Sequence, residues 1–344
     1  PGLVEKQQSM NIQTFGNATK LPAPPRSWRQ FCLFVVPVQE LALAFGFLLI
    51  GLTISSHFQI DFVFPTASSL EFTGMSYAVP LSLISAVAVY LTVTRQVMRL
   101  VYYAAAALAY AIILTTHFNI KLWMSLVNPA LWDDVYWKTD MMVRPLIDAS
   151  FAVHDLADQI LPAGEHLYLF AFLAMFACSI IVHSVQCFMV FRKVLFTAML
   201  VHVLGALSYL VMPALGPFIY EQGVNALESA RQVHMHGGYR ALMAGGRPWI
   251  ASEGSSYMFA AVAAMPSLHV ASSAVFVHYA WKHARWLGVA YLPLFAFIMF
   301  EAMATRWHYM VDLVAGLALT ALAIAVTAAL FRPIEAYHAA RGNR

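Results

Sequence analysis

A histidine and a carboxylate lie four residues apart in the segment Arg306-Trp-His308-Tyr-Met-Val-Asp312. At the start of a helix this spacing puts both side chains on one face, so Asp312 can accept a hydrogen bond from one imidazole nitrogen of His308. The other nitrogen is then free and more nucleophilic. The alternative is an interfacial pair that only caps the helix. The spacing predicts a nucleophile at His308 with Asp312 as its orienting partner.

A second group of residues, Pro266-Ser-Leu-His269, has the composition of a helix start. Proline suits the first turn of a helix because its missing N–H would have no partner there. Ser267 and the free backbone N–H groups around it form an anion site that the helix dipole supports. His269, in the same turn, could give a proton to a leaving oxygen. The alternative is an ordinary helix start with a solvated histidine.

A third group supplies positive charge, with Arg240 and Arg247 separated by six residues. Two guanidinium groups can neutralise and orient phosphate oxygens through bidentate hydrogen bonds. Gly245 and Gly246 let the backbone bend between them. Each arginine by itself could equally be a solvated loop residue. Taken together along the chain, the arginines, the Pro266–His269 group and the His308–Asp312 pair favour one phosphoryl-transfer site.

Composition places these groups in a membrane protein. Of the 344 residues 61% are hydrophobic and only 11% are charged, with a mean hydropathy of +0.68. A soluble domain is about 45–50% apolar and about 25% charged, so the bilayer must be the solvent of this chain. The net charge of +3 is spread over short loops, which argues against a nucleic-acid partner. His234 and His236 resemble a metal pair, but no third ligand has a convincing spacing, so we expect no metal and no cofactor.

Apolar runs of about 20 residues predict an all-α, polytopic bundle of about eight transmembrane helices. The predicted spans are residues 33–54, 76–94, 100–118, 166–188, 194–213, 265–283, 286–304 and 309–331. We expect one transmembrane domain over 33–331, with outer loops at 119–165 and 214–264. Residues 1–32 and 332–344 are then a cytoplasmic amino-terminal segment and a cytoplasmic tail.

Loop charges predict the orientation of these spans. The connections on one side carry the basic residues Arg26, Arg29, Arg95, Arg99, Arg192, Lys193, Lys282, Arg285 and Arg332. The opposite loops are acidic or mixed, with Asp61, Glu71 and six aspartates between positions 133 and 158. The positive-inside rule therefore predicts that both termini are cytoplasmic. All three groups of candidate residues then face the periplasm, lumen or outside.

The three groups resemble the signature motifs of the type 2 phosphatidic acid phosphatase (PAP2) superfamily. Its Lys-x6-Arg-Pro motif is similar to Arg240-x6-Arg247-Pro, with arginine in place of lysine. Its Pro-Ser-Gly-His motif is similar to Pro266-Ser-Leu-His269. Its third motif, Ser-Arg-x5-His-x3-Asp, is matched in its second half by His308-x3-Asp312. The resemblance covers roughly residues 240–316 and implies a PAP2-like helical core.

Two departures from these motifs point to one branch of the superfamily. Ala302 stands where the third motif has arginine, and Leu268 replaces the glycine of the second motif. Both features resemble the inositol phosphorylceramide synthase, or aureobasidin-resistance, branch, which is also expected to have eight spans. The resemblance implies that His308 is the nucleophile that becomes a phosphohistidine, that Asp312 orients it, and that His269 acts as general acid and then base. It also implies phosphate binding by Arg240, Arg247 and Ser267, with Arg306 replacing the missing arginine.

These observations predict a membrane enzyme that moves a phosphate or phospho-headgroup from a lipid donor to a hydroxyl acceptor. The expected donor is a phospholipid or a polyprenyl or sphingolipid phosphate. One alternative is a simple phosphatase for phosphatidate or polyprenyl phosphate. Another is a non-enzymatic transporter of an anionic lipid or solute. Transporters usually show paired repeats with broken helices near the midplane, and no repeat is visible in this sequence.

Overall fold

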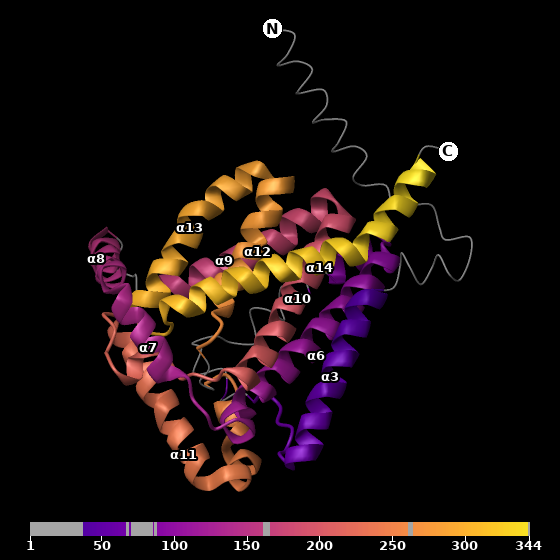
Figure 1. Ribbon diagram of the computed structural model, residues 1–344. Coiled ribbons are helices and arrows are strands. Elements are labelled where there is room, and N and C mark those ends of the chain that lie inside the picture. Colours follow the sequence, from indigo (N-terminus) through magenta and orange to yellow (C-terminus); the bar gives the residue numbers. More distant parts are fainter. Residues whose placement is uncertain are drawn as a thin grey trace.

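The computed structural model describes residues 37–66, 69, 85, 88–160, 166–260 and 264–342, and these residues form helices and connections without a β-strand (Figure 1). This confirms the predicted all-α fold. The helices are α3 (Val38–Phe58), α6 (Val97–Val127), α7 (Asp133–Met142), α8 (Arg144–Ile160), α9 (Leu167–Gln186), α10 (Phe188–Val211), α11 (Ala226–Tyr257), α12 (Leu268–His283), α13 (Arg285–Ala304) and α14 (Met310–Gly342), with a 3-10 turn η2 at Pro217–Ile219.

Six described helices are long and apolar enough to cross a membrane: α3, α6, α9, α10, α13 and α14. They coincide with six of the eight predicted spans. The predicted span 265–283 corresponds to α12, which has 16 residues. This is shorter than the roughly 20 residues that an untilted helix needs to cross the hydrocarbon core. The predicted span 76–94 lies mainly outside the described residues.

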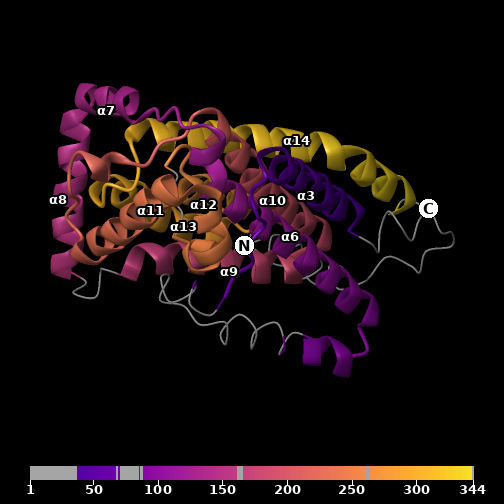
Figure 2. The ribbon, with the colours of Figure 1, turned by 90° about the horizontal axis from the view of Figure 1, so that it is seen from below.

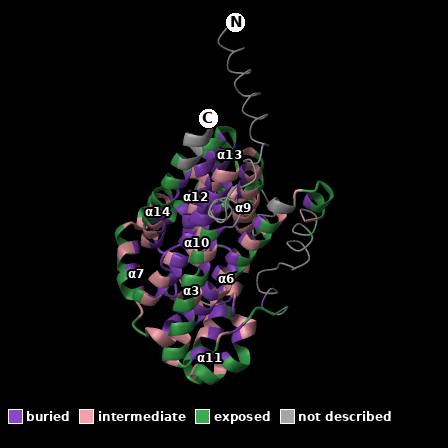
Figure 3. Ribbon diagram, turned by 90° about the vertical axis from the view of Figure 1, so that its right-hand side faces the viewer, coloured by how far each residue is buried: buried purple, intermediate pink, exposed green. Residues whose placement is uncertain are grey.

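Helix α10 lies at the centre of the bundle, packed against α3, α6, α9, α12 and α14. It is apolar on all sides, which is the pattern of a helix surrounded by other helices. Residues such as Val194 and Val201 are fully buried, whereas Phe45 and Leu49 on the peripheral helix α3 are 53% and 66% exposed. Figure 3 shows this distribution, with buried residues along α10 and exposed ones on the outer sides of α7 and α14. Large apolar side chains on the outside are expected where lipid is the solvent.

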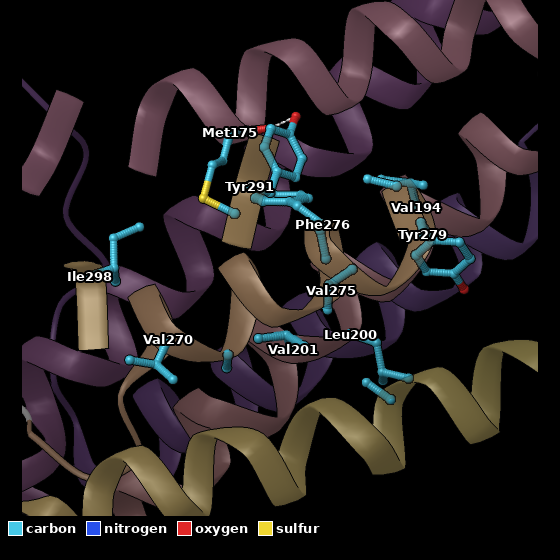
Figure 4. Packing of buried hydrophobic residues seen from close by; sticks show 14 of the residues in the cluster. Met175, Val194, Leu200, Val201, Val270, Val275, Phe276, Tyr279, Tyr291 and Ile298 are labelled. Atoms are coloured by element: carbon cyan, nitrogen blue, oxygen red, sulfur yellow. Dashed lines mark hydrogen bonds between the residues drawn. The ribbon is translucent and has the colours of Figure 1, made fainter. Parts of the chain in front are cut away.

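The largest core cluster joins α9, α10, α12 and α13 (Figure 4). Met175, Val201 and Phe276 pack there with Tyr291, whose hydroxyl donates a hydrogen bond of 2.9 Å to the backbone oxygen of Met175. The tyrosine can therefore be buried without leaving its polar atom unpaired. This packing holds α12 against its neighbours and so determines where its first turn lies.

Both predicted outer loops contain helices. Helix α6 continues to Val127, and α7 and α8 follow it within 119–165, while α11 occupies much of 214–264. Helix α8 packs against α13, and α7 packs against α14. Seen from below, α7 and α8 lie at one end of the molecule, far from the last turns of α14 (Figure 2). These helices form a structured layer over the end of the bundle where α12 and α14 begin.

Candidate active site

The segments Pro266–His269 and Arg306–Asp312 meet at this end of the bundle. The backbone N–H of Ser267 donates to the backbone oxygen of Asp312 at 3.0 Å, which joins the start of α12 to the first turn of α14. The backbone N–H of His308 donates to Ala302 at 3.1 Å and so fixes the connection from α13. The structure therefore brings His269 and His308 to one location from helices that are separate in the sequence.

His308 precedes α14, and its ring is held through one nitrogen. Its Nδ1 lies 2.9 Å from the backbone oxygen of Ala264 and 3.4 Å from Oδ2 of Asp312. A carbonyl oxygen can only accept, so Nδ1 carries the proton and Nε2 keeps its lone pair. The side chain of Asp312 reaches back from the first turn because the same oxygen also accepts from the N–H of Tyr309 at 2.8 Å. The predicted pair is thus formed, although His308 lies before the helix and not on it.

His308 is 8% exposed, and this burial determines the charge of its ring. Burial lowers the pKa of His308 to about 3, although the hydrogen bond to Ala264 acts in the opposite direction. The positive charge of Lys121 on α6 lowers this pKa further. At neutral pH the imidazole is therefore uncharged, which is the form that can attack an electrophile.

His269 lies in the first turn of α12 and is held by aromatic side chains from α9. The hydroxyl of Tyr168 lies 3.0 Å from its Nδ1, and the two rings meet edge to face with centroids 5.2 Å apart. Phe172 makes a second edge contact with a centroid distance of 4.7 Å. Its Nε2 has no hydrogen-bond partner among the described residues, so this nitrogen is available to a ligand. Tyr168 was not among the residues predicted from the sequence.

Ser267 is the N-cap of α12, with an extended backbone conformation. The sequence suggested that Pro266 lies in the first turn of the helix. In the structure the helix begins at Leu268, so Pro266 precedes the N-cap. The reason is that the N–H of Ser267 is engaged by Asp312. The side-chain oxygen of Ser267 is buried and has no partner in the described part of the chain. Together with the free N–H groups of the first turn, it forms a cradle suited to an anion.

Arg306 is fully buried, and carboxylates surround its guanidinium group. Its Nη2 lies 3.0 Å from Oδ2 of Asp140, its Nε lies 3.3 Å from Oε2 of Glu221, and the group stacks over the ring of Trp137. These contacts anchor the connection between α13 and α14 to α7. Phosphate binding by Arg306 stays a prediction, since the described contacts engage this residue in building the site.

The structure does not bring Arg240 and Arg247 together with the two histidines. Both arginines are exposed on α11, and Arg247 donates to Oε1 of Gln59 at 3.0 Å. The expected backbone bend is present, because Gly246 has a φ of +59° and interrupts the helix. Within the described residues neither arginine is hydrogen-bonded or ion-paired to His269 or His308, and their phosphate role stays a prediction.

Two aspartates on α7, which the sequence did not mark as site residues, support the site. Asp133 accepts hydrogen bonds from the N–H groups of Leu215 and Gly216 and from the hydroxyl of Tyr309 at 2.8 Å. Burial raises the pKa of Asp133 and these donors lower it. Asp140 accepts from the N–H of Met310 at 2.8 Å. Asp133 therefore ties the backbone at positions 215 and 216 to the side chain of Tyr309, and Asp140 holds the first residue of α14.

The sequence model of the PAP2 superfamily matches residues 160–326. This segment runs from the start of α9 to the middle of α14 and contains both histidines and Asp312. The matched part of the chain is therefore similar to a superfamily of phosphatases and phosphotransferases, the class to which the site geometry also points. Comparison with curated proteins and with solved structures gives no match.

Proposed function

We propose that the protein is a membrane-embedded phosphotransferase or phosphatase for lipid phosphate esters, which works through a phosphohistidine at His308. The observation that carries this proposal is the geometry of His308. Its Nδ1–H is held by Ala264 and Asp312, so that the lone pair on Nε2 is free at neutral pH. An oriented, uncharged imidazole beside an anion cradle is the arrangement that nucleophilic attack on phosphorus requires.

The first step breaks the donor ester. Nε2 of His308 attacks the phosphorus atom, the P–N bond forms, and the bond from phosphorus to the leaving oxygen breaks. The electron pair of that bond stays on the leaving oxygen, which takes a proton from His269. The carboxylate of Asp312 stabilises the positive charge that the ring of His308 acquires. His308 is among the groups that interact electrostatically with His269, so the two imidazole groups lie close to one another.

The second step transfers the phosphoryl group. His269 accepts the proton of an incoming hydroxyl group, whose oxygen attacks phosphorus while the P–N bond breaks and its electron pair returns to His308. With water as the acceptor the product is free phosphate, and with a lipid or polyol hydroxyl it is a new phosphoester. Water is present at about 55 M, so transfer requires a bound, aligned acceptor and a shielded intermediate.

The surroundings of the histidines support transfer over hydrolysis. Tyr309 is fully buried next to His308, and Leu268, beside His269, packs against Gly205 of α10. Trp307 is held by a 2.7 Å hydrogen bond from its Nε1 to Glu228 of α11. These apolar and aromatic side chains limit the access of water to the intermediate. The resemblance of Leu268 and Ala302 to the inositol phosphorylceramide synthase branch supports the same preference.

The decisive experiment follows the label from a lipid to the protein and on to a product. Purified protein receives phosphatidate labelled with ³²P, with and without candidate hydroxyl acceptors. We expect an acid-labile label on the wild-type protein and on the exposed-histidine control His57→Ala, and none on His308→Ala. Substantial turnover by folded His308→Ala would reject the nucleophile. Free phosphate at the full rate with every acceptor would identify a phosphatase.

We further propose that the site faces the periplasm, lumen or outside, with both termini in the cytoplasm. The loop charges and the position of the site at one end of the bundle support this orientation. A cysteine introduced at Ser255 on α11 should react with an impermeant reagent on intact cells. Reaction only after permeabilisation would reverse the orientation.

A further inference from the structure

Lys121 on α6 is a cation without an anion. The side chain is partly buried, and no described carboxylate lies within ion-pair distance of it; nor does it form a hydrogen bond with any described residue. Two fully buried cations of the described chain are paired, Arg192 with Glu40 at 2.9 Å and Arg306 with Asp140 at 3.0 Å. A buried charge without a partner is costly, so its presence indicates an anionic ligand.

An apolar cluster connects the surroundings of Lys121 with the segments that carry the two histidines. Lys121 lines a cavity between α6 and α11 with Ser125, Tyr239 and Trp249. Met124, less than one helical turn further along, belongs to the apolar cluster, against which Leu268 and Trp307 pack. These two residues are the direct neighbours of His269 and His308. Met235 and Ala260 line this cavity and also belong to that cluster, so the apolar cluster lies between the cavity and the candidate active site.

The charge of Lys121 acts on the candidate site. Its electrostatic interactions reach both His269 and His308, and they extend to His117, which lies one turn earlier on the same face of α6. His117 is in turn held by the backbone oxygen of His202 at 3.0 Å. This contact ties the face of α6 that carries Lys121 to the central helix α10.

A phosphoryl group at His308 needs a cation that is free to bind it. The charge of Arg306 is balanced by Asp140 and Glu221, although its Nη1 has no hydrogen-bond partner among the described residues, and Arg240 and Arg247 are exposed on α11. We propose that Lys121 is the cation that binds the non-bridging oxygens of the substrate phosphate, opposite the cradle at the start of α12. This inference rests on the proposed function, and it assigns to a residue of α6 the positive charge that the sequence motifs assigned to arginines.

The first test measures the binding of orthovanadate, an analogue of the transferred phosphoryl group, by titration calorimetry in detergent. We expect Lys121→Met to bind orthovanadate about 10- to 100-fold more weakly, the scale of one lost charge-assisted hydrogen bond. Lys121→Arg, which keeps the charge, should retain most of the affinity. The matched control Lys138→Met removes an exposed lysine of α7 and should bind as the wild type does. A folded Lys121→Met protein that binds orthovanadate as tightly as the wild type would overturn the inference. A loss of orthovanadate affinity in Arg247→Gln instead would assign the phosphate contact to that arginine.

A second measurement uses only the wild-type protein and so does not depend on the folding of a variant. Acetic anhydride modifies free lysine amines, and mass spectrometry locates the product. Orthovanadate should protect Lys121 and leave the modification of Lys138 unchanged. Equal modification of Lys121 with and without orthovanadate would contradict the proposal. Absence of a phosphohistidine in the wild-type protein would reject the proposed function, whereas His308-dependent turnover without any contribution from Lys121 would reject only this inference.

Discussion

Replacement of Asp312 by asparagine separates the charge of this residue from its shape. In the structure Oδ2 of Asp312 accepts from the N–H of Tyr309 at 2.8 Å and lies 3.4 Å from Nδ1 of His308. Asparagine can keep the first contact with its carbonyl oxygen. The backbone oxygen of Ala264, 2.9 Å from Nδ1, still holds the ring proton. His308 should therefore keep its proton on Nδ1 in Asp312→Asn. The substitution then removes only the negative charge of residue 312.

The expected cost follows from the distance between the two groups. When His308 becomes positively charged in the intermediate, two unit charges 3.4 Å apart attract by about 5 kcal/mol at an effective dielectric constant of about 20. The amide dipole retains part of this attraction, so we expect a loss of about 3–5 kcal/mol. Since about 1.4 kcal/mol corresponds to a factor of ten, Asp312→Asn should form the phosphohistidine about 10²- to 10⁴-fold more slowly.

The assay is a single-turnover measurement of label transfer from ³²P-phosphatidate to the protein, by rapid quench. Asp158→Asn, which changes an exposed aspartate of α8, is the matched control and should transfer at the wild-type rate. Thermal unfolding in detergent verifies that both variants are folded. A folded Asp312→Asn protein that keeps more than a tenth of the wild-type rate would refute the electrostatic role of Asp312.

Three further predictions concern protonation. Tyr168→Phe removes the hydroxyl 3.0 Å from Nδ1 of His269 and should lower the rate about tenfold with a displaced pH–rate profile; an unchanged profile would contradict the positioning role. Burial lowers the pKa of His308 to about 3, so the rate of phosphohistidine formation should not fall through protonation of His308 between pH 7 and pH 5. A fall in this rate centred near pH 6.5, present also in Tyr168→Phe, would contradict this prediction. The hydrogen bond to Glu301 raises the pKa of His154, so this pair stabilises α8 fully below about pH 6.5 and progressively less as the pH rises through the raised pKa; hydrogen exchange in α8, corrected for its intrinsic rate, should increase over that range, and His154→Gln should abolish the dependence.

The sequence alone determined the long apolar helices, but not the helices α7, α8 and α11 within the predicted loops. In a bilayer a backbone must satisfy its own hydrogen bonds, so each apolar run of about 20 residues has to form a helix. For this reason six predicted spans agree with described helices that could cross a membrane. Local spacing also placed His308 near Asp312, because the aspartate in the first turn of α14 lies only four residues after the histidine that precedes the helix. The bend at Gly246 was predictable for a similar reason, since it depends on one residue type.

Only the tertiary structure decided which polar side chains surround the histidines. Tyr168 reaches His269 from α9, and the charge of Lys121 acts from α6, because of how these helices are rotated and packed around α10. Arg306 looks like a phosphate ligand from its position in the sequence, but Asp140 and Glu221, from distant segments, surround it. Helix rotation and partner choice depend on side-chain packing among many helices, and spacing within a single segment contains no information about them.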